Sequence, residues 1–171
     1  MGKTRQIKND RMAVQEISTF WREMLPKGFS IACFKKNSDE IIGMNVLDVS
    51  SVKDPKDDSK VKCSIFSIFV SSFFLCFQFQ SQNLSDVFGV MSHAQEQFNV
   101  FQHYKVEEYL IAYGLCVDTT YRGRGIATEM LKARKPLLEA LGLKVTTTAF
   151  TGIGSQKAAK KAGFEENFVV T

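Results

Sequence analysis

Residues 114–131 read GLCVDTTYRGRGIATEML, and this stretch decides the fold expected for the whole chain. The apolar run over residues 109–117 predicts a strand, and the polar residues 118–125 that follow predict a tight, basic turn. A helix is predicted to begin near Ile126, where apolar residues start to recur at helical spacing. The predicted order is therefore strand, basic turn, helix.

The predicted turn carries two glycines that bracket a positive charge, since Gly123 and Gly125 flank Arg124. Glycine has no Cβ and tolerates positive φ, so successive N–H groups can converge here on one point. The start of the helix adds unpaired N–H groups and the positive end of its dipole, and Arg122 and Arg124 add two full charges. Such a turn suits a phosphate or pyrophosphate group.

The residues after the glycines exclude two familiar phosphate-binding motifs. A nucleotide-hydrolysing P-loop requires Lys-Ser/Thr after its last glycine, whereas Ile126 and Ala127 follow here. A Rossmann fingerprint requires a third glycine where this chain has Thr128. What remains is R-x-x-G-x-A, formed by Arg122, Gly125 and Ala127. This pattern resembles the pyrophosphate-binding loop of the GNAT superfamily of acetyl-CoA-dependent N-acetyltransferases; a glycine-rich turn with solvated arginines is the structural alternative.

Composition limits the number of domains and the kinds of partner. The 171 residues suffice for a single domain with a full core. The formal net charge of +4 is a mild basic excess that fits an anionic ligand, without the clustered cations and interleaved aromatics of nucleic-acid-binding proteins. Only two histidines are present, so no metal site is expected. Residues 1–10 contain no apolar segment typical of a secretory signal.

The four cysteines lack CxxC spacing and lie in apolar runs, which predicts reduced, buried thiols. They are Cys33, Cys63, Cys76 and Cys116. We therefore expect a cytoplasmic monomer without a nucleic-acid or membrane partner.

Periodicity and turn residues predict an α/β chain in which helices and strands alternate around a mixed sheet. Helices are predicted over residues 12–25, 81–102, 126–141 and 155–162, and strands over 29–35, 40–49, 109–117, 144–150 and 164–170. Ser85 is the expected N-cap of the second helix, and Pro136 is expected to kink the third. Asn45 is interpreted as a surface-facing strand residue in preference to a substrate contact, and His93 and His103 are placed on the solvent side.

The downstream half carries a more specific resemblance. LCVDTTYRGRGIATEMLKARKPLLEALGL, a threonine-rich strand and GSQKAAKKAGFEE together resemble the insect-type arylalkylamine N-acetyltransferases of the GNAT superfamily. The resemblance implies a single GNAT-type domain whose mostly antiparallel central sheet, flanked by helices, opens in a V-shaped splay that holds acetyl-CoA. The implied pantetheine partners are backbone groups of Leu115, Cys116 and Val117. The implied pyrophosphate partners are the N–H groups of Gly123, Arg124, Gly125, Ile126 and Ala127, with the charges of Arg122 and Arg124.

The resemblance also implies how the reaction is catalysed. An amine must be neutral to attack the thioester, and the departing thiolate needs a proton. In the resembling family the base is a glutamate in the first strand–helix unit, assisted by serines near the start of the last helix. Ser155 matches the second serine and Thr151 stands at the first, with helix capping as the alternative role for both. Aligned by this resemblance, this sequence is expected to begin at the family's second helix, without a counterpart of the glutamate's strand–helix unit, and to end within the last hairpin.

Two functions therefore remain open. The first is an acetyl-CoA-dependent N-acetyltransferase that moves an acetyl group to the primary amine of a small arylalkylamine by direct attack in a ternary complex. The second is a catalytically impaired, CoA-binding splice form or incomplete gene product.

Residues 61–80, VKCSIFSIFVSSFFLCFQFQ, interrupt the resemblance and show neither helical nor alternating period. A membrane helix is one interpretation, but an uncharged core over 63–77 would be only about 22 Å long, against the ~30 Å of the hydrocarbon. A buried strand is the second, although serines lie among its apolar residues. The third, which we favour, is an insertion of translated intron, since these residue types permit pyrimidine-rich codons.

We predict that deleting residues 61–80 raises the soluble yield and leaves acetyl-CoA affinity nearly unchanged. Uncharged, Phe-rich segments without proline tend to pair with one another, and the expected cofactor-binding groups all lie beyond Tyr113. Expression yield and acetyl-CoA titration provide the test. A deletion that unfolds the protein would identify the stretch as a true core strand.

Overall fold

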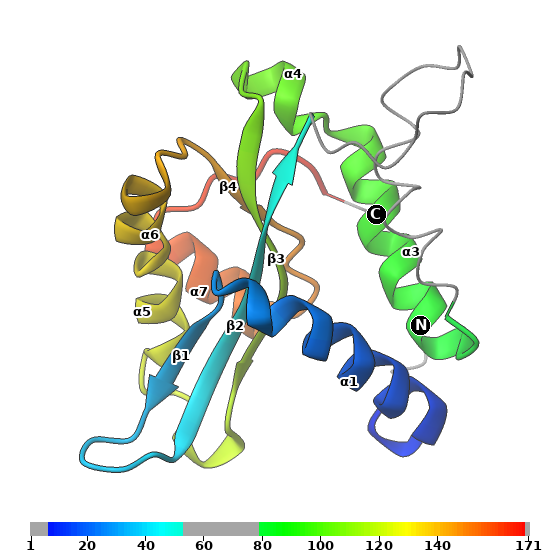
Figure 1. Ribbon diagram of the computed structural model, residues 1–171, viewed down its shortest axis with the longest axis vertical. Coiled ribbons are helices and arrows are strands. Elements are labelled where there is room, and N and C mark those ends of the chain that lie inside the picture. Colours follow the sequence, from blue (N-terminus) through cyan, green and yellow to red (C-terminus); the bar gives the residue numbers. More distant parts are fainter. Residues whose placement is uncertain (1–6, 53–78, 170–171) are drawn as a thin grey trace.

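The computed structural model describes residues 7–52 and 79–169, and a four-stranded sheet lies at its centre (Figure 1). The strands are β1 (Ile31–Phe34), β2 (Ile41–Ser51), β3 (Glu108–Val117) and β4 (Thr146–Thr148), in the spatial order β1-β2-β3-β4. β1 with β2 and β2 with β3 pair antiparallel, whereas β3 and β4 pair parallel. The predicted mixed, mostly antiparallel sheet is confirmed.

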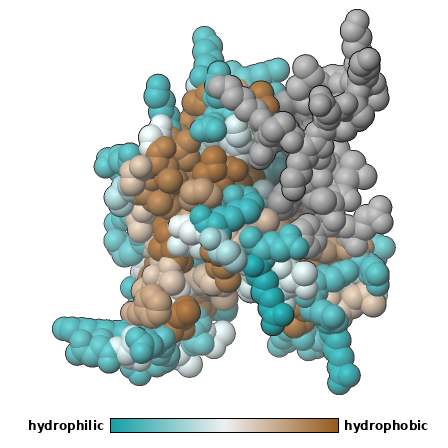
Figure 2. All heavy atoms as spheres, in the orientation of Figure 1, coloured by the Kyte–Doolittle hydropathy of each residue, from teal (hydrophilic) through white to brown (hydrophobic). Residues whose placement is uncertain are grey.

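Helices cover both faces of this sheet (Figure 1). They are α1 (Arg11–Met24), α3 (Gln82–Gln97), α4 (Val100–Tyr104), α5 (Ile126–Lys132), α6 (Arg134–Leu141) and α7 (Ile153–Ala162). On one face, Phe20 of α1 and Phe88 of α3 bury Val46 of β2. On the other, α6 packs on Leu47 and Leu110, and Figure 2 shows apolar side chains gathered in the region of α6 and β2. None of the helices within the described residues has the length and apolarity to cross a bilayer.

α1 forms where its apolar period predicts a helix. The Asp10 carboxylate caps it by accepting hydrogen bonds of 3.1 Å from the N–H groups of Met12 and Ala13. Phe20 and Met24 are buried on its inner face. A 3-10 turn, Leu25–Lys27, ends at Gly28, whose φ of 78° lies in the left-handed region that glycine tolerates.

Polar side chains tie the start of α3 to α1. The N-cap is Ser81, so the prediction of Ser85 is wrong: the helix begins one turn earlier because the Ser81 hydroxyl accepts from the N–H of Leu84. The same hydroxyl donates to Asp10 Oδ2 over 2.7 Å. Glu16 Oε1 accepts from the N–H of Gln80 over 2.6 Å.

Residue 79 adds apolar contact at the same junction. The Phe79 ring lies 4.7 Å from that of Phe88, measured between centroids, so Phe79 packs against the core. The rest of the stretch 61–80, with Cys63 and Cys76, lies outside the described residues. A deletion ending at residue 78 spares the Phe79 and Gln80 contacts and is the matched control for removal of 61–80.

Two predicted helices are shorter than their apolar periods suggest. The helix predicted over 81–102 ends at Gln97, because Asn99 leaves the helical conformation and caps α4 through its side chain. The helix predicted over 126–141 divides at Ala133 into α5 and α6. Pro136 lies in the first turn of α6, where its missing N–H breaks no intrahelical hydrogen bond. The proline therefore coincides with a break between two helices.

The predicted last strand is wrong for residues 164–169, which form no strand. Among the described strands the sheet ends at β4, and residues 164–169 pair with none of them. Without a hydrogen-bonded neighbour, an apolar segment has no ladder to join. β4 itself is limited to Thr146–Thr148, inside the predicted range 144–150.

Replacing Asp10 with Ala should lower the melting temperature at pH 7, because α1 loses its cap and Ser81 and Asn83 lose their acceptor. Hydrogen bonds from Ser81, Asn83 and the helix N–H groups lower the pKa of Asp10. A depressed folded-state pKa contributes stability that is present above the unfolded-state pKa and lost as the pH falls through the folded-state pKa. The wild-type and Ala curves of melting temperature against pH should therefore converge only in acid. Asp10→Asn, which keeps a capping side chain, is the control and should lose less; curves that stay parallel into acid would contradict this account.

Candidate functional site

The turn after β3 is built by Asp118. Its N–H donates to the carbonyl of Ile42 over 2.9 Å, which ties the end of β3 to β2. Its Oδ1 accepts from the N–H of Thr120 over 2.8 Å and from the Thr120 hydroxyl over 2.6 Å. These hydrogen bonds, with a smaller contribution from the charge of Arg122, lower the pKa of Asp118. A short 3-10 turn, Thr119–Tyr121, follows and directs the chain toward the glycines.

The glycines leave the backbone of the turn uncovered. Gly123 and Gly125 have φ values of 77° and 81°, which side-chain-bearing residues rarely adopt. A Cβ placed on either glycine would meet no atom within 4 Å, so both face open space. Gly125 caps α5 without any side-chain hydrogen bond. Among the described residues, the N–H groups of residues 123–127 donate to no acceptor.

Both arginines of the turn are exposed, and their side chains lie against the turn itself. Arg122 Nε donates to the carbonyl of Val117 over 3.1 Å. Arg124 Nη2 donates to the carbonyl of Thr120 over 3.4 Å, and its guanidinium lies 5.2 Å from the ring centre of Tyr121. Within the described part of the chain neither arginine pairs with a carboxylate. The two positive charges are therefore available to an anion.

The turn is also held from the β1–β2 hairpin. The Tyr121 hydroxyl donates to Glu40 Oε1 over 3.2 Å. Glu40 in turn forms a salt bridge of 3.1 Å with Lys35. These contacts hold Tyr121, and with it the start of the turn, to the β1–β2 hairpin.

β3 extends past its parallel partner. Only Leu110, Ile111 and Ala112 pair with β4, and β3 continues to Val117 after an irregularity in register beside Tyr113. Leu115 and Val117 are half-buried, and Cys116 is exposed. The expected pantetheine partners thus lie on the part of β3 that β4 leaves unpaired, where the V-shaped opening is predicted.

The cysteine prediction is wrong at the two described positions. Cys116 is exposed and Cys33 is half-buried, both as free thiols. Each lies on a strand near the end of its pairing, where an apolar neighbourhood in sequence does not ensure cover in space.

Asn45 is fully buried, so its assignment to the surface is wrong. Its Nδ2 donates to the carbonyl of Gly114 over 2.7 Å, and its Oδ1 accepts from Arg134 Nε over 2.8 Å. Arg134 is itself 0% exposed, and burial lowers its pKa to about 10, which leaves it charged at neutral pH. The sequence does contain a signal for Arg134: it lies three and four residues before Leu137 and Leu138, on the apolar face of its helix.

Ser155 and Thr151 flank the start of α7. Ser155 lies in its first turn, and its hydroxyl donates to the carbonyl of Gly152 over 2.8 Å. Thr151 is exposed and precedes the N-cap, which is Gly152 and has no side-chain hydrogen bond. Neither hydroxyl caps the helix, because the helix begins at Ile153 and not at Ser155 as predicted.

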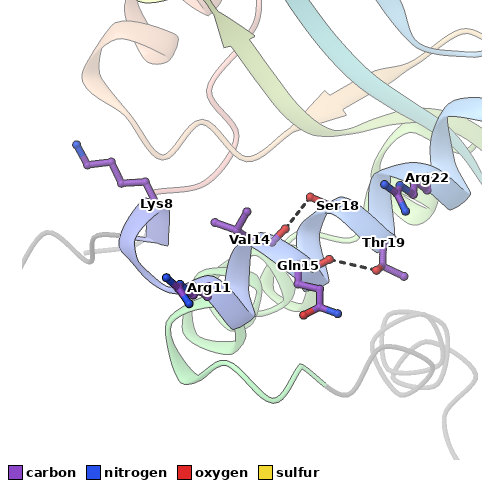
Figure 3. Close-up of a pocket in the computed structure, with 7 residues that line it drawn as sticks. All are labelled: Lys8, Arg11, Val14, Gln15, Ser18, Thr19 and Arg22. Carbon is purple, nitrogen blue, oxygen red and sulfur yellow. Dashed lines mark hydrogen bonds between the residues drawn. The ribbon is translucent and has the colours of Figure 1, made fainter.

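The outer face of α1 carries an open hollow of about 470 Å³ (Figure 3). Its lining comprises Lys8, Arg11, Val14, Gln15, Ser18, Thr19 and Arg22. The hydroxyls of Ser18 and Thr19 donate to carbonyls of the preceding helical turn, as Figure 3 shows. No predicted site residue borders this hollow. His93 and His103 are exposed elsewhere, as expected, and no cluster among the described residues could hold a metal ion.

The family model of GNAT acetyltransferases matches residues 86–164, a segment that includes the basic turn. The chain is 41% identical to a protein assigned as arylalkylamine N-acetyltransferase 7 from the yellow fever mosquito, with a TM-score of 0.80 over 96% of this chain and 62% of the mosquito chain.

More distant structures share the fold. Arylalkylamine N-acetyltransferase 2 from Aedes aegypti is 20% identical, with a TM-score of 0.67 over 86% of this chain and 62% of its own. The Drosophila melanogaster polyamine N-acetyltransferase is 14% identical, with a TM-score of 0.66 over 85% of this chain and 62% of its own. This chain thus spans less than two thirds of the length of each of the three proteins.

Proposed function

We propose that this chain binds acetyl-CoA at the turn after β3 and transfers its acetyl group to the primary amine of a small arylalkylamine. The observation that carries the proposal is the run of N–H groups at residues 123–127, which lack acceptors and lie inside the segment matched by the GNAT family model. The amine class rests on the 41% identity to the protein assigned as a mosquito arylalkylamine N-acetyltransferase.

The turn has the chemistry that a pyrophosphate needs. Phosphate oxygens accept hydrogen bonds from backbone N–H groups, and the absence of side chains at Gly123 and Gly125 permits close approach. Arg122 and Arg124 supply positive charge beside them, and neither forms a salt bridge with a carboxylate of the described residues. Leu115, Cys116 and Val117 would offer backbone groups to the pantetheine on the edge of β3 that faces away from β2, beyond the end of the pairing with β4.

Acetyl-CoA supplies an activated acyl group when bound; the chain's own residues must orient it and handle protons. We propose that the Ser155 hydroxyl, with Thr151 beside it, relays a proton as the C–N bond forms and the C–S bond breaks. It donates its own proton to the leaving sulfur and accepts the proton that the attacking amine nitrogen loses, so the hydroxyl is neutral before and after the step. Ser155 is half-buried, and its hydroxyl donates a hydrogen bond to the Gly152 carbonyl. Rotation about χ1 would break this hydrogen bond and free the hydroxyl to donate elsewhere. Neither hydroxyl is occupied in capping a helix, which favours a role beyond helix stability.

The second candidate is CoA binding without transfer, because the N–H groups of residues 123–127 could hold the cofactor without any group that handles protons. Saturable acetyl-CoA binding accompanied by amine-dependent release of free CoA indicates an acetyltransferase. Saturable binding without release indicates the impaired form.

Gly125→Val should abolish acetyl-CoA binding. Valine is strongly disfavoured at a φ of 81°, and its side chain would occupy the space in front of the N–H groups. Calorimetric titration measures the loss. Gly142→Val is the matched control, because Gly142 has a φ of 69° at the end of α6, away from the turn; it should lower the melting temperature and keep the affinity.

Arg124→Ala should weaken acetyl-CoA binding by an amount that shrinks as salt is raised, because exposed charges are screened. The dissociation constants of both proteins are measured over a salt series. Unchanged affinity in both the Gly125 and the Arg124 variants would remove the phosphate-loop assignment.

Ser155→Ala should lower kcat on the order of 10²-fold, the lower end of a typical general acid–base contribution, with KM nearly unchanged. Steady-state CoA release at saturating acetyl-CoA is the measurement. Ser155→Thr keeps the hydroxyl and should retain most of the rate. Equal kcat in the wild type and the Ala variant would assign Ser155 a purely structural role.

A further inference from the structure

Arg134 is a buried cation whose hydrogen-bond partners are all neutral. It begins α6 and is 0% exposed. Its Nη1 donates to the hydroxyl of Thr148 over 2.6 Å and to that of Thr146 over 3.3 Å. Its Nη2 has no acceptor within the described residues, and the ring of Phe164 lies 5.5 Å from Cζ. A buried charge is costly without a counter-charge, so this arrangement requires an explanation beyond packing.

The partners of Arg134 connect both strands that border the predicted opening. Through Nε it binds Asn45 Oδ1, and Asn45 Nδ2 holds the carbonyl of Gly114 on β3. Through Nη1 it binds Thr148 on β4. The orientation of the Asn45 amide is determined by this pairing, because a guanidinium has donors only and must face the amide oxygen.

These contacts lie where the two strands part. Thr148 is opposite Ala112, the last β3 residue in register with β4. Gly114 follows two residues later, beside the register irregularity at Tyr113. The segment Leu115, Cys116 and Val117 leads on from Gly114 to the basic turn. Whatever orients the Gly114 carbonyl therefore orients the start of the predicted pantetheine-binding segment.

We propose that Arg134 is a positioning residue for acetyl-CoA binding: through Asn45 it orients the Gly114 carbonyl, and through Thr148 it sets the separation of β3 from β4. This inference rests on the proposed function.

The chemistry of Asn45 supports positioning over simple charge burial. If the only requirement were to stabilise the buried guanidinium, a carboxylate at position 45 would serve better, since it accepts the same hydrogen bond and supplies the counter-charge. A carboxylate cannot donate to the Gly114 carbonyl. An amide both accepts from Arg134 and donates to Gly114, which is what a positioning relay needs.

Asn45→Asp separates the two roles, because it keeps the acceptor for Arg134 and removes the donor to Gly114. The full chain is compared with this variant by melting temperature, by acetyl-CoA titration, and by the backbone amide NMR shifts of residues 114–117 without ligand. We expect a melting temperature near that of the wild type, displaced amide shifts, and affinity weaker by about tenfold or more, as for a misplaced binding group. Arg134→Met should displace the same amides and also lower the melting temperature.

Leu138→Ala is the matched control. Leu138 packs on the sheet one helical turn from Arg134 and takes no part in the hydrogen bonds, so the variant should lose stability and keep both the affinity and the amide shifts. If Asn45→Asp does not fold, the same amide shifts and affinity are measured for Thr148→Val. This variant removes the β4 acceptor of Arg134 with little change of side-chain shape.

Unchanged affinity and amide shifts in a folded Asn45→Asp protein would overturn the positioning role. In that case wild-type binding of acetyl-CoA would still support the proposed function. A wild-type chain that does not bind acetyl-CoA would overturn the proposed function, and the positioning role with it.

Discussion

The antiparallel pairing of β2 with β3 is the constraint on which the rest of the structure depends. Helices cover both faces of this pair of strands, so the side chain of each strand residue points toward the helices of one face or of the other. Val46 packs beneath α1 and α3, while Leu47, its neighbour, packs beneath α6. A slip of one residue would exchange these faces and expose the core of both layers. The register therefore determines which β3 residue lies beside Asn45, and how far β3 continues after its pairing with β4 has ended.

The turn after β3 combines exposed donors with a rigid frame. Asp118 holds it to β2 and orders its first residues, and Tyr121 holds it to the β1–β2 hairpin. The side chains of Asp118 and Tyr121 supply the frame, whereas a Cβ at Gly123 or Gly125 would meet no atom within 4 Å. A preformed turn of this kind lowers the conformational entropy lost on binding, because the N–H groups of residues 123–127 already have their positions before a ligand binds. The conformational entropy is lost during folding instead, when the two glycines are held at positive φ.

The turn and the buried cation lie at opposite ends of α5. Gly125 is the N-cap of α5, and Arg134 begins α6 directly after the break at Ala133. That break, in the turn before Pro136, lets Arg134 leave the direction of α5 and reach Asn45 and both threonines of β4. The basic turn and a polar contact inside the sheet are thereby connected through the short helix α5. The same segment buries Leu131 against α7, so α5 also connects the turn to the helix that carries Ser155.

The sequence by itself determined the local features: the helix 12–25, the order of the strands, the mixed sheet, and the basic turn with its two uncovered glycines. These follow from period, glycine placement and charge, which act within a few residues. Only the tertiary structure decided that Asn45 is buried, because its partner Arg134 is distant in the chain and alternation in a strand does not reveal which face is covered. It likewise decided that Ser81 begins α3 through Asp10, and that residues 164–169 form no strand. Each of these depends on a hydrogen-bond partner brought near by folding, and a single sequence contains no measure of that proximity.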